Sequence, residues 1–344
     1  MSLGAALAAC TVDPGDNPFD LPAATSIGAP EGSTGGTGDP GTGNPGSGDP
    51  TAGADGSSGE SDDPGSGIKL DVASPDTDGN GPGEGSGEGC SFIDLLFVVD
   101  ISASMNEEKA NLDANFPSFV QVMDDYVADP TNNALGYRLG VTNSSVVDNG
   151  ADQSTMGLDG RLFAGTFTDC GTAGTPWLDG PDAAITANFS CLAPNPISDC
   201  MSCSDFGRER PLDVLEMFID KSTPGGPNEG FYRGDDALLV IVLLTDEDDD
   251  AAFTTTTPAA TKAAIDAFAG GEERYVVVTI AGPPAGQCNS AFGSASAAPL
   301  LHEFTGLVPN GLMGDICQGD LAASLEQALE LIQLSCDSLP PPAG

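Results

Sequence analysis

Basic side chains are scarce in this sequence of 344 residues. Ten Lys and Arg stand against 52 Asp and Glu, which gives a formal net charge of −42 at pH 7. Because a nucleic-acid-binding surface has to be basic, no nucleic-acid partner is expected. The acid excess suits a cation or a basic partner. Solubility in a salty or acidic medium is the alternative explanation.

Histidine and long apolar runs are also lacking. His302 is the only imidazole, which leaves little capacity for general-base catalysis, and the sequence has no Gly-x-Ser-x-Gly nucleophile motif. The sequence therefore favours a protein that is not an enzyme, with a metal-dependent hydrolase as the weaker alternative. No run reaches the roughly 18 apolar residues that a membrane-spanning helix needs.

Aromatic and large apolar residues are almost missing from residues 11–89. This stretch consists mainly of Gly, Ser, Thr, Pro and Asp, and it cannot bury enough apolar surface to offset the entropy cost of ordering. A disordered, self-repelling linker is predicted there. One folded domain is expected over residues 90–337, followed by a short tail over residues 338–344.

Residues 1–10 end in Leu7-Ala8-Ala9-Cys10, which has the form of a bacterial lipobox. The cysteine of such a signal is acylated after cleavage, so Cys10 is the predicted lipidation site. The preceding apolar stretch is short and contains no Lys or Arg, which keeps a chance match in a cytosolic protein as the alternative. We expect a lipid-anchored protein of the bacterial cell envelope that meets the membrane only through this lipid. Display on the outer membrane, facing the surface or the periplasm, is favoured.

Eight cysteines remain besides Cys10, an even number that is typical of an exported, disulfide-bonded domain. Cys90 precedes the first predicted strand and Cys336 follows the last predicted helix, so a bridge between the domain ends is expected. Cys288 and Cys317 are a second candidate pair. An irregular insertion, residues 169–206, holds the other four, which are Cys170, Cys191, Cys200 and Cys203. A zinc or redox role for the last two, as a Cys-x-x-Cys motif, is the alternative.

Strand and helix patterns alternate along the predicted domain. Two unbroken apolar runs, Phe92–Val99 and Ala237–Leu244, are typical of buried strands in a parallel sheet. The alternation predicts an α/β fold, a doubly wound and mostly parallel sheet with helices on both faces. Pro117 either kinks the first helix or marks its start. The further predicted strands are 137–142, 161–168 (joined to the former as a hairpin) and 274–281, and the predicted helices are 106–128, 211–221, 258–269, 297–304 and a last one capped by Asp320.

Polar side chains follow both of the unbroken apolar runs. Asp100, Ser102 and Ser104 come after the first, and Thr245-Asp246 comes after the second. Since parallel strands end at the same edge of a sheet, these side chains are expected to meet in a crevice there. Their oxygens suit Mg²⁺, with Ca²⁺ or Mn²⁺ as alternatives. A helix cap is the competing explanation, but it accounts for one of the first three residues and not for Asp246.

The segments FIDLLFVVDISASM and LLVIVLLTDEDD together resemble the von Willebrand factor type A domain, over roughly residues 90–336. The lipobox and the linker add a similarity to bacterial surface lipoproteins that carry such a domain. The resemblance implies a Rossmann-like fold and a metal-ion-dependent adhesion site, with Asp100, Ser102, Ser104 and Asp246 as cation ligands. A cation that has few charged ligands attracts an acidic group from a partner.

One ligand of the family, a threonine on a separate loop, has no counterpart here. At the expected place the sequence reads Ser202-Cys203-Ser204, so either Ser202 or Ser204 is expected to supply the hydroxyl. Asp248 is expected to lie behind the cation ligands or to help hold a Ca²⁺. Asp249 and Asp250 are expected in a solvated loop. The Cys-rich insertion is expected near the metal face, where it would shape specificity.

These features predict a divalent-cation-dependent adhesion module on a bacterial cell surface. It would bind an acidic group of an extracellular protein or glycan. The linker would extend the reach of the module, and clustering on a membrane would add avidity. The alternative is a cation-binding structural protein of the envelope, for which the acidity itself is the useful property.

Overall fold

The computed structural model describes residues 89–146, 157–164, 170–172, 174–193, 209–318 and 321–339. Several sequence-based predictions therefore lie outside the described residues. These are the linker up to residue 88, the end of the tail from residue 340, the lipobox with Cys10, the helix cap Asp320, and the insertion residues Cys200, Ser202, Cys203 and Ser204.

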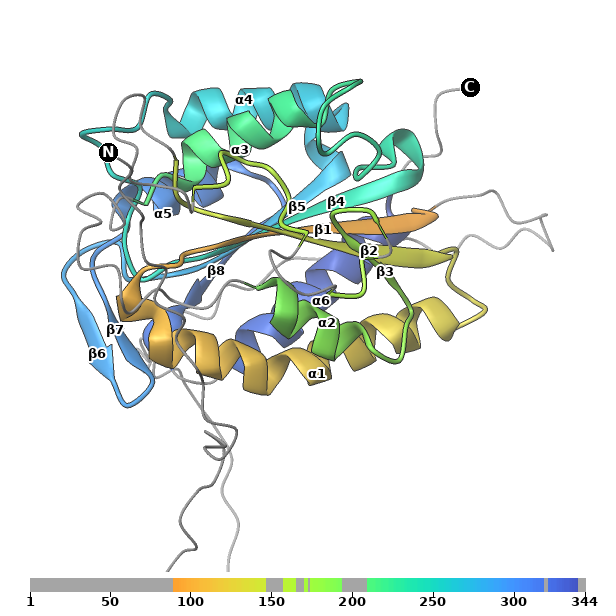
Figure 1. The fold of residues 1–344 in the computed structure, drawn as a ribbon, viewed down its shortest axis with the longest axis horizontal. Coiled ribbons are helices and arrows are strands. Elements are labelled where there is room, and N and C mark those ends of the chain that lie inside the picture. The colour runs from red at the N-terminus through yellow and green to blue at the C-terminus, as the bar shows by residue number, and fades with distance from the viewer. Residues whose placement is uncertain are drawn as a thin grey trace, which may run out of the picture. The chain divides into compact units, whose positions relative to one another are not determined.

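A six-stranded sheet forms the centre of the described domain, in the order β3-β2-β1-β4-β5-β8 (Figure 1). Neighbouring strands are parallel except β3, which runs antiparallel to β2. This confirms the mixed α/β prediction with a mostly parallel sheet. The strands are β1 (Phe92–Val99), β2 (Gly136–Asn143), β3 (Leu178–Gly180), β4 (Ala237–Leu244), β5 (Tyr275–Ala281) and β8 (Gly311–Asp315).

The strand order reverses between β1 and β4. The chain leaves β1 to form β2 on one side and later places β4 on the other side. The two central strands run in register, from Phe92 opposite Ala237 to Val99 opposite Leu244. Crossover connections then diverge at the carboxyl ends of β1 and β4, which opens a crevice at that edge of the sheet.

Helices cover both faces of the sheet (Figure 1). In β4, Leu238 and Val240 belong to one apolar cluster while Leu239 and Ile241 belong to the other. Each such fully buried side chain contributes roughly 1.5–3 kcal/mol of transfer free energy. The helices on one face are α1 (Asn106–Ala128), α2 (Ile185–Leu192) and α6 (Leu321–Asp337), and those on the other are α3 (Pro211–Lys221), α4 (Pro258–Ala269) and α5 (Pro299–Leu307).

The smaller elements complete the described structure. A separate hairpin consists of β6 (Cys288–Ser290) and β7 (Gly293–Ala295). Short 3₁₀ turns are η1 (Ala103–Met105), η2 (Gly234–Asp236), η3 (Glu272–Arg274) and η4 (Ile316–Gln318). None of the helices among the described residues is both long and apolar enough to cross a membrane.

Pro117 lies inside α1, so the prediction that it marks the helix start is wrong. A proline inside a helix removes one backbone hydrogen bond. Packing on both sides of it holds the helix together: Phe116 stacks on Phe189 of α2 with ring centres 3.6 Å apart, and Phe119 packs edge-on against Phe97 of β1 at 6.3 Å. Tertiary contacts therefore override the local penalty.

The described part of the predicted strand 161–168 does not form a regular hairpin with β2. Residues 161–164 lie outside any strand, and residues 165–168 lie outside the described residues. The antiparallel neighbour of β2 is β3, although Phe163 N still donates to Val141 O of β2 at 2.7 Å. The cause is again tertiary. Leu162 is buried against the second apolar cluster, and its N–H donates to Asn228 Oδ1 at 2.9 Å. An apolar stretch that has strand propensity is used here to fill the core.

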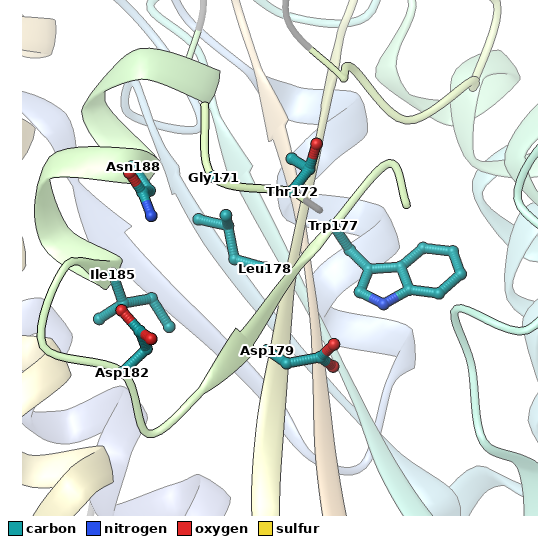
Figure 2. A pocket seen from close by; sticks show the side chains of 8 residues that line it. All are labelled: Gly171, Thr172, Trp177, Leu178, Asp179, Asp182, Ile185 and Asn188. Atoms are coloured by element: carbon teal, nitrogen blue, oxygen red, sulfur yellow. The ribbon is translucent and has the colours of Figure 1, made fainter. Parts of the chain in front are cut away.

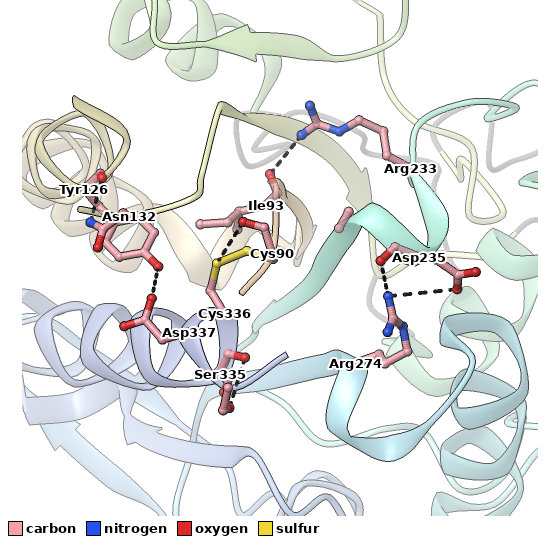
Figure 3. Close-up of a disulfide and its surroundings, with 12 residues drawn as sticks. Cys90, Ile93, Tyr126, Asn132, Arg233, Asp235, Arg274, Ser335, Cys336 and Asp337 are labelled. Atoms are coloured by element: carbon pink, nitrogen blue, oxygen red, sulfur yellow. Dashed lines mark hydrogen bonds and ion pairs between the residues drawn. A yellow bond between two sulfur atoms is a disulfide. The ribbon is translucent and has the colours of Figure 1, made fainter. Parts of the chain in front are cut away.

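Three disulfides are present among the described residues: Cys90–Cys336, Cys170–Cys191 and Cys288–Cys317. The first joins the two ends of the domain across 246 residues of chain, and next to it Tyr126 donates to Asp337 Oδ1 at 2.6 Å (Figure 3). Two of these pairs were expected from the sequence. Three disulfides indicate that the domain folds in an oxidising compartment, which is either the periplasm or the outside of the cell.

Candidate metal site

Asp100 and Asp246 lie at the carboxyl ends of the two central strands. Asp100 follows β1, and its N–H donates to Leu244 O of β4 at 2.9 Å. Asp246 follows β4 by two residues, and its carbonyl accepts from Ser296 N at 2.8 Å. The side chains are buried, with 1% and 4% of the residue surface exposed. Both strands thus deliver a carboxylate to the crevice at the switch point.

A backbone N–H and a hydroxyl donate to the Asp100 carboxylate. Ser102 N donates to Asp100 Oδ1 at 2.6 Å, and Thr245 Oγ1 donates to Asp100 Oδ2 at 2.9 Å. The turn η1 then brings Ser104 back, so that the Ser102 and Ser104 hydroxyl oxygens are 2.8 Å apart. Ser102 is buried, whereas Ser104 is exposed. The two hydroxyls therefore form a pair of neutral oxygen ligands that opens toward solvent.

The two carboxylates at this site are costly to ionise. Burial raises the pKa of Asp100 to about 7; the charge of Asp246 adds to the shift, and the Ser102 and Thr245 hydrogen bonds oppose it. Burial also raises the pKa of Asp246, against contacts with Ser104 and Asp100. Asp246 Oδ1 is buried with no hydrogen-bond partner among the described residues. Such an oxygen is satisfied by a cation or a proton.

Glu209 is a site residue that the sequence reasoning missed. It directly precedes Arg210 and α3 and pairs with Ser145 in a β-bridge beside the end of β2. It is 1% exposed; Oε2 accepts from Ser144 Oγ, and Oε1 has no partner among the described residues. Burial, together with the charge of Asp100, raises its pKa well above the ordinary value. The sequence search sought a hydroxyl and so passed over this carboxylate.

The acidic run after β4 serves several purposes. Asp248 accepts backbone hydrogen bonds from Leu300 and Leu301, each at 3.1 Å, at the N-terminus of α5. The expectation that Asp249 is solvated is wrong: it is 2% exposed, and it accepts from Leu212 N at 2.8 Å and from Thr254. Only part of this run therefore faces the crevice, and the rest anchors the helices on one side of the sheet.

A cleft of about 510 Å³ adjoins the candidate metal site. The Asp246 side of the cleft also includes Ser104 and Glu247. The opposite wall comes from the segment around the β6–β7 hairpin, which the Cys288–Cys317 disulfide ties to η4. Polar groups dominate that wall, which consists of Gln287, Cys288, Asn289, Ser294, Ala295 and Ser296. The sequence led us to expect the Cys-rich insertion beside the metal site. Among the described residues, the β6–β7 hairpin lies there.

A second group with metal-ligand spacing is Cys288, Asp315 and Cys317, whose ligand atoms lie within 4.8 Å of one another. The two cysteines form a disulfide, and a disulfide sulfur is not the thiolate that binds metal. Asp315 Oδ1 accepts from Cys317 N at 2.9 Å and so stabilises the η4 turn. In its oxidised form this group anchors the hairpin and is not a cation site.

A smaller cavity of about 210 Å³ lies at the opposite edge of the sheet, between β3 and α2 (Figure 2). Asn188 and Ile185 of α2 lie on one side of it, and Trp177 and Asp179 on the other. The Asp179 carboxylate is already paired with Arg138 Nε at 2.8 Å. All the residues that line this cavity belong to the predicted insertion, and none of them is a predicted cation ligand.

Comparisons with known proteins assign the chain to no family. No protein-family model matches the chain, and neither does any curated protein. Solved structures similar to it include proximal thread matrix protein 1 from the mussel byssus, with 14% identity and a TM-score of 0.38 over 72% of this chain. Another is the open conformation of the pilus adhesin SpaC from Lactobacillus rhamnosus GG, with 13% identity and a TM-score of 0.36 over 70% of this chain. The chain spans 47% and 30% of those two proteins, and similarities this low establish neither family nor function.

Proposed function

We propose that residues 90–337 are a von Willebrand factor A-type binding module, and not an enzyme. It holds an acidic group of an extracellular protein or glycan through a divalent cation. One observation carries the proposal: Asp100 and Asp246 meet at adjacent strand ends beside the paired Ser102 and Ser104 hydroxyls, and Asp246 Oδ1 is buried without a partner among the described residues.

The residues present fit a hard cation. Ser102, Ser104, Asp100 and Asp246 would hold it, and Glu209 would take the place of the threonine that the sequence lacks. All five offer oxygen, as Mg²⁺, Ca²⁺ and Mn²⁺ require. The cation would supply an electrophile that accepts a carboxylate oxygen from the partner. Glu209 adds a charge where the family has a neutral hydroxyl, which favours the ions that tolerate more carboxylate ligands.

The only imidazole supports a binding role over hydrolysis. His302 lies on α5, and its Nε2 is 3.0 Å from Gly282 O. Among the hydrogen bonds of Asp100, none involves this ring. A cation site without a positioned base is better suited to holding a carboxylate than to cleaving a bond. The disulfides agree with an exported module, and the lipid anchor at Cys10 would place it on the cell surface.

Cation binding by the full chain tests the site itself. After metal removal, titration calorimetry with Mg²⁺ and Ca²⁺ should show Asp100→Asn and Asp246→Asn weakening affinity by at least about tenfold. Asp250→Asn is the matched control, because it removes the same charge from the same acidic run, and it should bind as the wild type does. Equal affinities for all four proteins would contradict the metal assignment.

Retention on immobilised poly-glutamate or polygalacturonate tests the partner chemistry. A chain with a net charge of −42 is repelled by such polymers. We expect retention only with a divalent cation, and loss of retention in Asp246→Asn while Asp250→Asn is still retained. If Asp246→Asn were retained as well as the wild type, the cation would be bridging acidic surfaces without using this site.

A further inference from the structure

One wall of the cleft beside the candidate metal site is built from small polar side chains. Gln287, Asn289, Ser294 and Ser296 line it opposite Asp246, and all four are exposed. Among the described residues, none of these four side chains has a hydrogen-bond partner. Two amides and two hydroxyls, which both donate and accept, are therefore free for a ligand. The wall presents uncharged hydrogen-bonding groups next to the proposed cation.

Backbone and disulfide contacts hold this wall in place without using those side chains. Asn289 of β6 lies directly opposite Ser294 of β7, so the two side chains are neighbours on one face of the hairpin. The disulfide described above ties β6 to η4. Ser296 N donates to Asp246 O at 2.8 Å, which joins the wall to the segment after β4. A wall fixed in this way presents its polar groups before a ligand arrives, which lowers the entropy cost of binding.

The cleft lacks the side chains that usually anchor a protein partner. Aromatic residues, Met and Arg are enriched in protein–protein interfaces, and Trp, Tyr and Arg dominate their binding energy. None of these lines the cleft among the described residues, where Ala295 and the disulfide-bonded Cys288 are the apolar part. No Lys or Arg lines this described part either. A ligand carboxylate would therefore find its counter-charge in the proposed cation.

An acidic sugar matches both halves of the cleft. Its carboxylate suits the cation, and its ring hydroxyls suit the amides and hydroxyls of the wall, because each of these groups both donates and accepts. The side chain of a glutamate or an aspartate ends in a carboxylate alone and leaves the wall without such partners. The cleft, at about 510 Å³, has the size of a small-ligand site, for which roughly 300–1,000 Å³ is usual.

We propose that the acidic partner is a glycan that contains uronic acid, and that Asn289 and Ser294 select it over a protein carboxylate. This inference rests on the proposed function, since the cation holds the uronate carboxylate. The two wall residues bind ring hydroxyls next to that carboxylate. A polymer of uronates presents many equivalent ligands, so that several copies of the domain on one surface bind it with avidity.

Titration calorimetry of the full chain in CaCl₂ tests this selection. The probes are tri-galacturonate and a tri-glutamate with blocked ends, which carry equal numbers of carboxylates. The wild type should bind tri-galacturonate at least about tenfold more tightly. Asn289→Ala combined with Ser294→Ala should weaken that binding by about tenfold, as expected for two hydrogen bonds, and should leave the affinities for tri-glutamate and Ca²⁺ unchanged. Gln121→Ala, which removes an exposed amide of α1 outside the cleft, should behave as the wild type does.

The outcomes separate this selection from the proposed function. Equal affinities of the wild type for the two probes, or tighter binding of tri-glutamate, would overturn the glycan in favour of a protein partner. Unchanged tri-galacturonate affinity in the double variant, or a loss of its Ca²⁺ affinity, would overturn the role of the wall. In these cases, binding that is lost in chelator and in Asp246→Asn still supports the proposed function. Binding of neither probe, or binding that survives both chelator and Asp246→Asn, would contradict the proposed function itself.

Discussion

At the scale of single residues, Asp249 shows how surroundings set the role of a side chain. It belongs to a run of five acids, Asp246–Asp250, that differ little in sequence terms. The fold places its carboxylate under the N-terminus of α3, where it accepts from Leu212 N and from Thr254 Oγ1. Burial raises its pKa to about 6, which these two hydrogen bonds only partly oppose. Asp249 is therefore an internal helix anchor with an energetic cost at neutral pH.

The pH dependence of stability follows from this shift. The pKa of Asp249 is about 6 in the folded state, against an ordinary value of 3.8. Between these two pH values the folded state therefore binds more protons than the unfolded state. The contribution of Asp249 to the free energy of unfolding is thus highest below about pH 4. It falls by roughly 2–3 kcal/mol as the pH rises through 6. Asp249→Asn should remove that fall. Urea unfolding near pH 4 and near pH 7 measures it, and an equal pH slope in wild type and variant would contradict this account.

At the scale of elements, α5 depends on a carboxylate from a distant loop. Its own N-cap position, Ala298, offers no side-chain acceptor. Asp248 fills that role from the segment after β4, with both oxygens near the Leu300 N–H. A carboxylate at a helix N-terminus is favourable, because it satisfies free N–H groups and faces the positive end of the helix dipole. The crevice and α5 are therefore joined through one loop.

Replacing Asp248 separates two explanations of this residue. Asp248→Ala leaves the Leu300 and Leu301 N–H groups without their acceptor, which should lower the free energy of unfolding by about 1–3 kcal/mol. If capping is its role, cation affinity should change by less than about twofold, well below the tenfold typical of residues behind metal ligands. Urea unfolding and calorimetry on the same variant measure both quantities. A large loss of affinity with little loss of stability would show that Asp248 supports the cation instead.

At the scale of the whole molecule, the domain gathers buried acids around one crevice. Burial is the largest cause of the raised pKa values of Asp100, Asp246, Glu209 and Glu108. Each of these charges makes the folded state less stable once it is ionised. The disulfide between Cys90 and Cys336 acts in the opposite direction, because it closes a loop of most of the domain and so limits the unfolded chain.

Stability in chelator should therefore fall as the pH rises from about 4 to about 7, and a divalent cation should restore it. At about 100 times its Kd, a cation that binds only the folded state contributes about 2.7 kcal/mol. The gain should be larger near pH 7.5 than near pH 5, where protons compete for the same oxygens. Urea unfolding with Ca²⁺ or with chelator at both values tests this. An equal gain at both values, or none, would mean that the acids of the crevice do not bind the ion.

The sequence by itself determined the elements whose pattern is local. Phe92–Val99 and Ala237–Leu244 form strands with the predicted bounds, because an unbroken apolar run is stable only when both faces are covered. The same logic brought Asp100 and Asp246 to one edge of the sheet, since each lies within two residues of the end of such a strand. Helices with a clear apolar stripe, such as 211–221 and 258–269, were likewise predictable.

Only the tertiary structure decided what depends on distant contacts. Glu209 enters the site because a β-bridge to Ser145 places it there, and no local pattern marks it. Residues 161–164 lie beside β2 without forming a strand because the core takes up Leu162, and Asp249 is buried because α3 covers it. Local patterns report which surface a segment must bury. Which partner buries it is a property of the folded chain, because that choice depends on residues far away in the sequence.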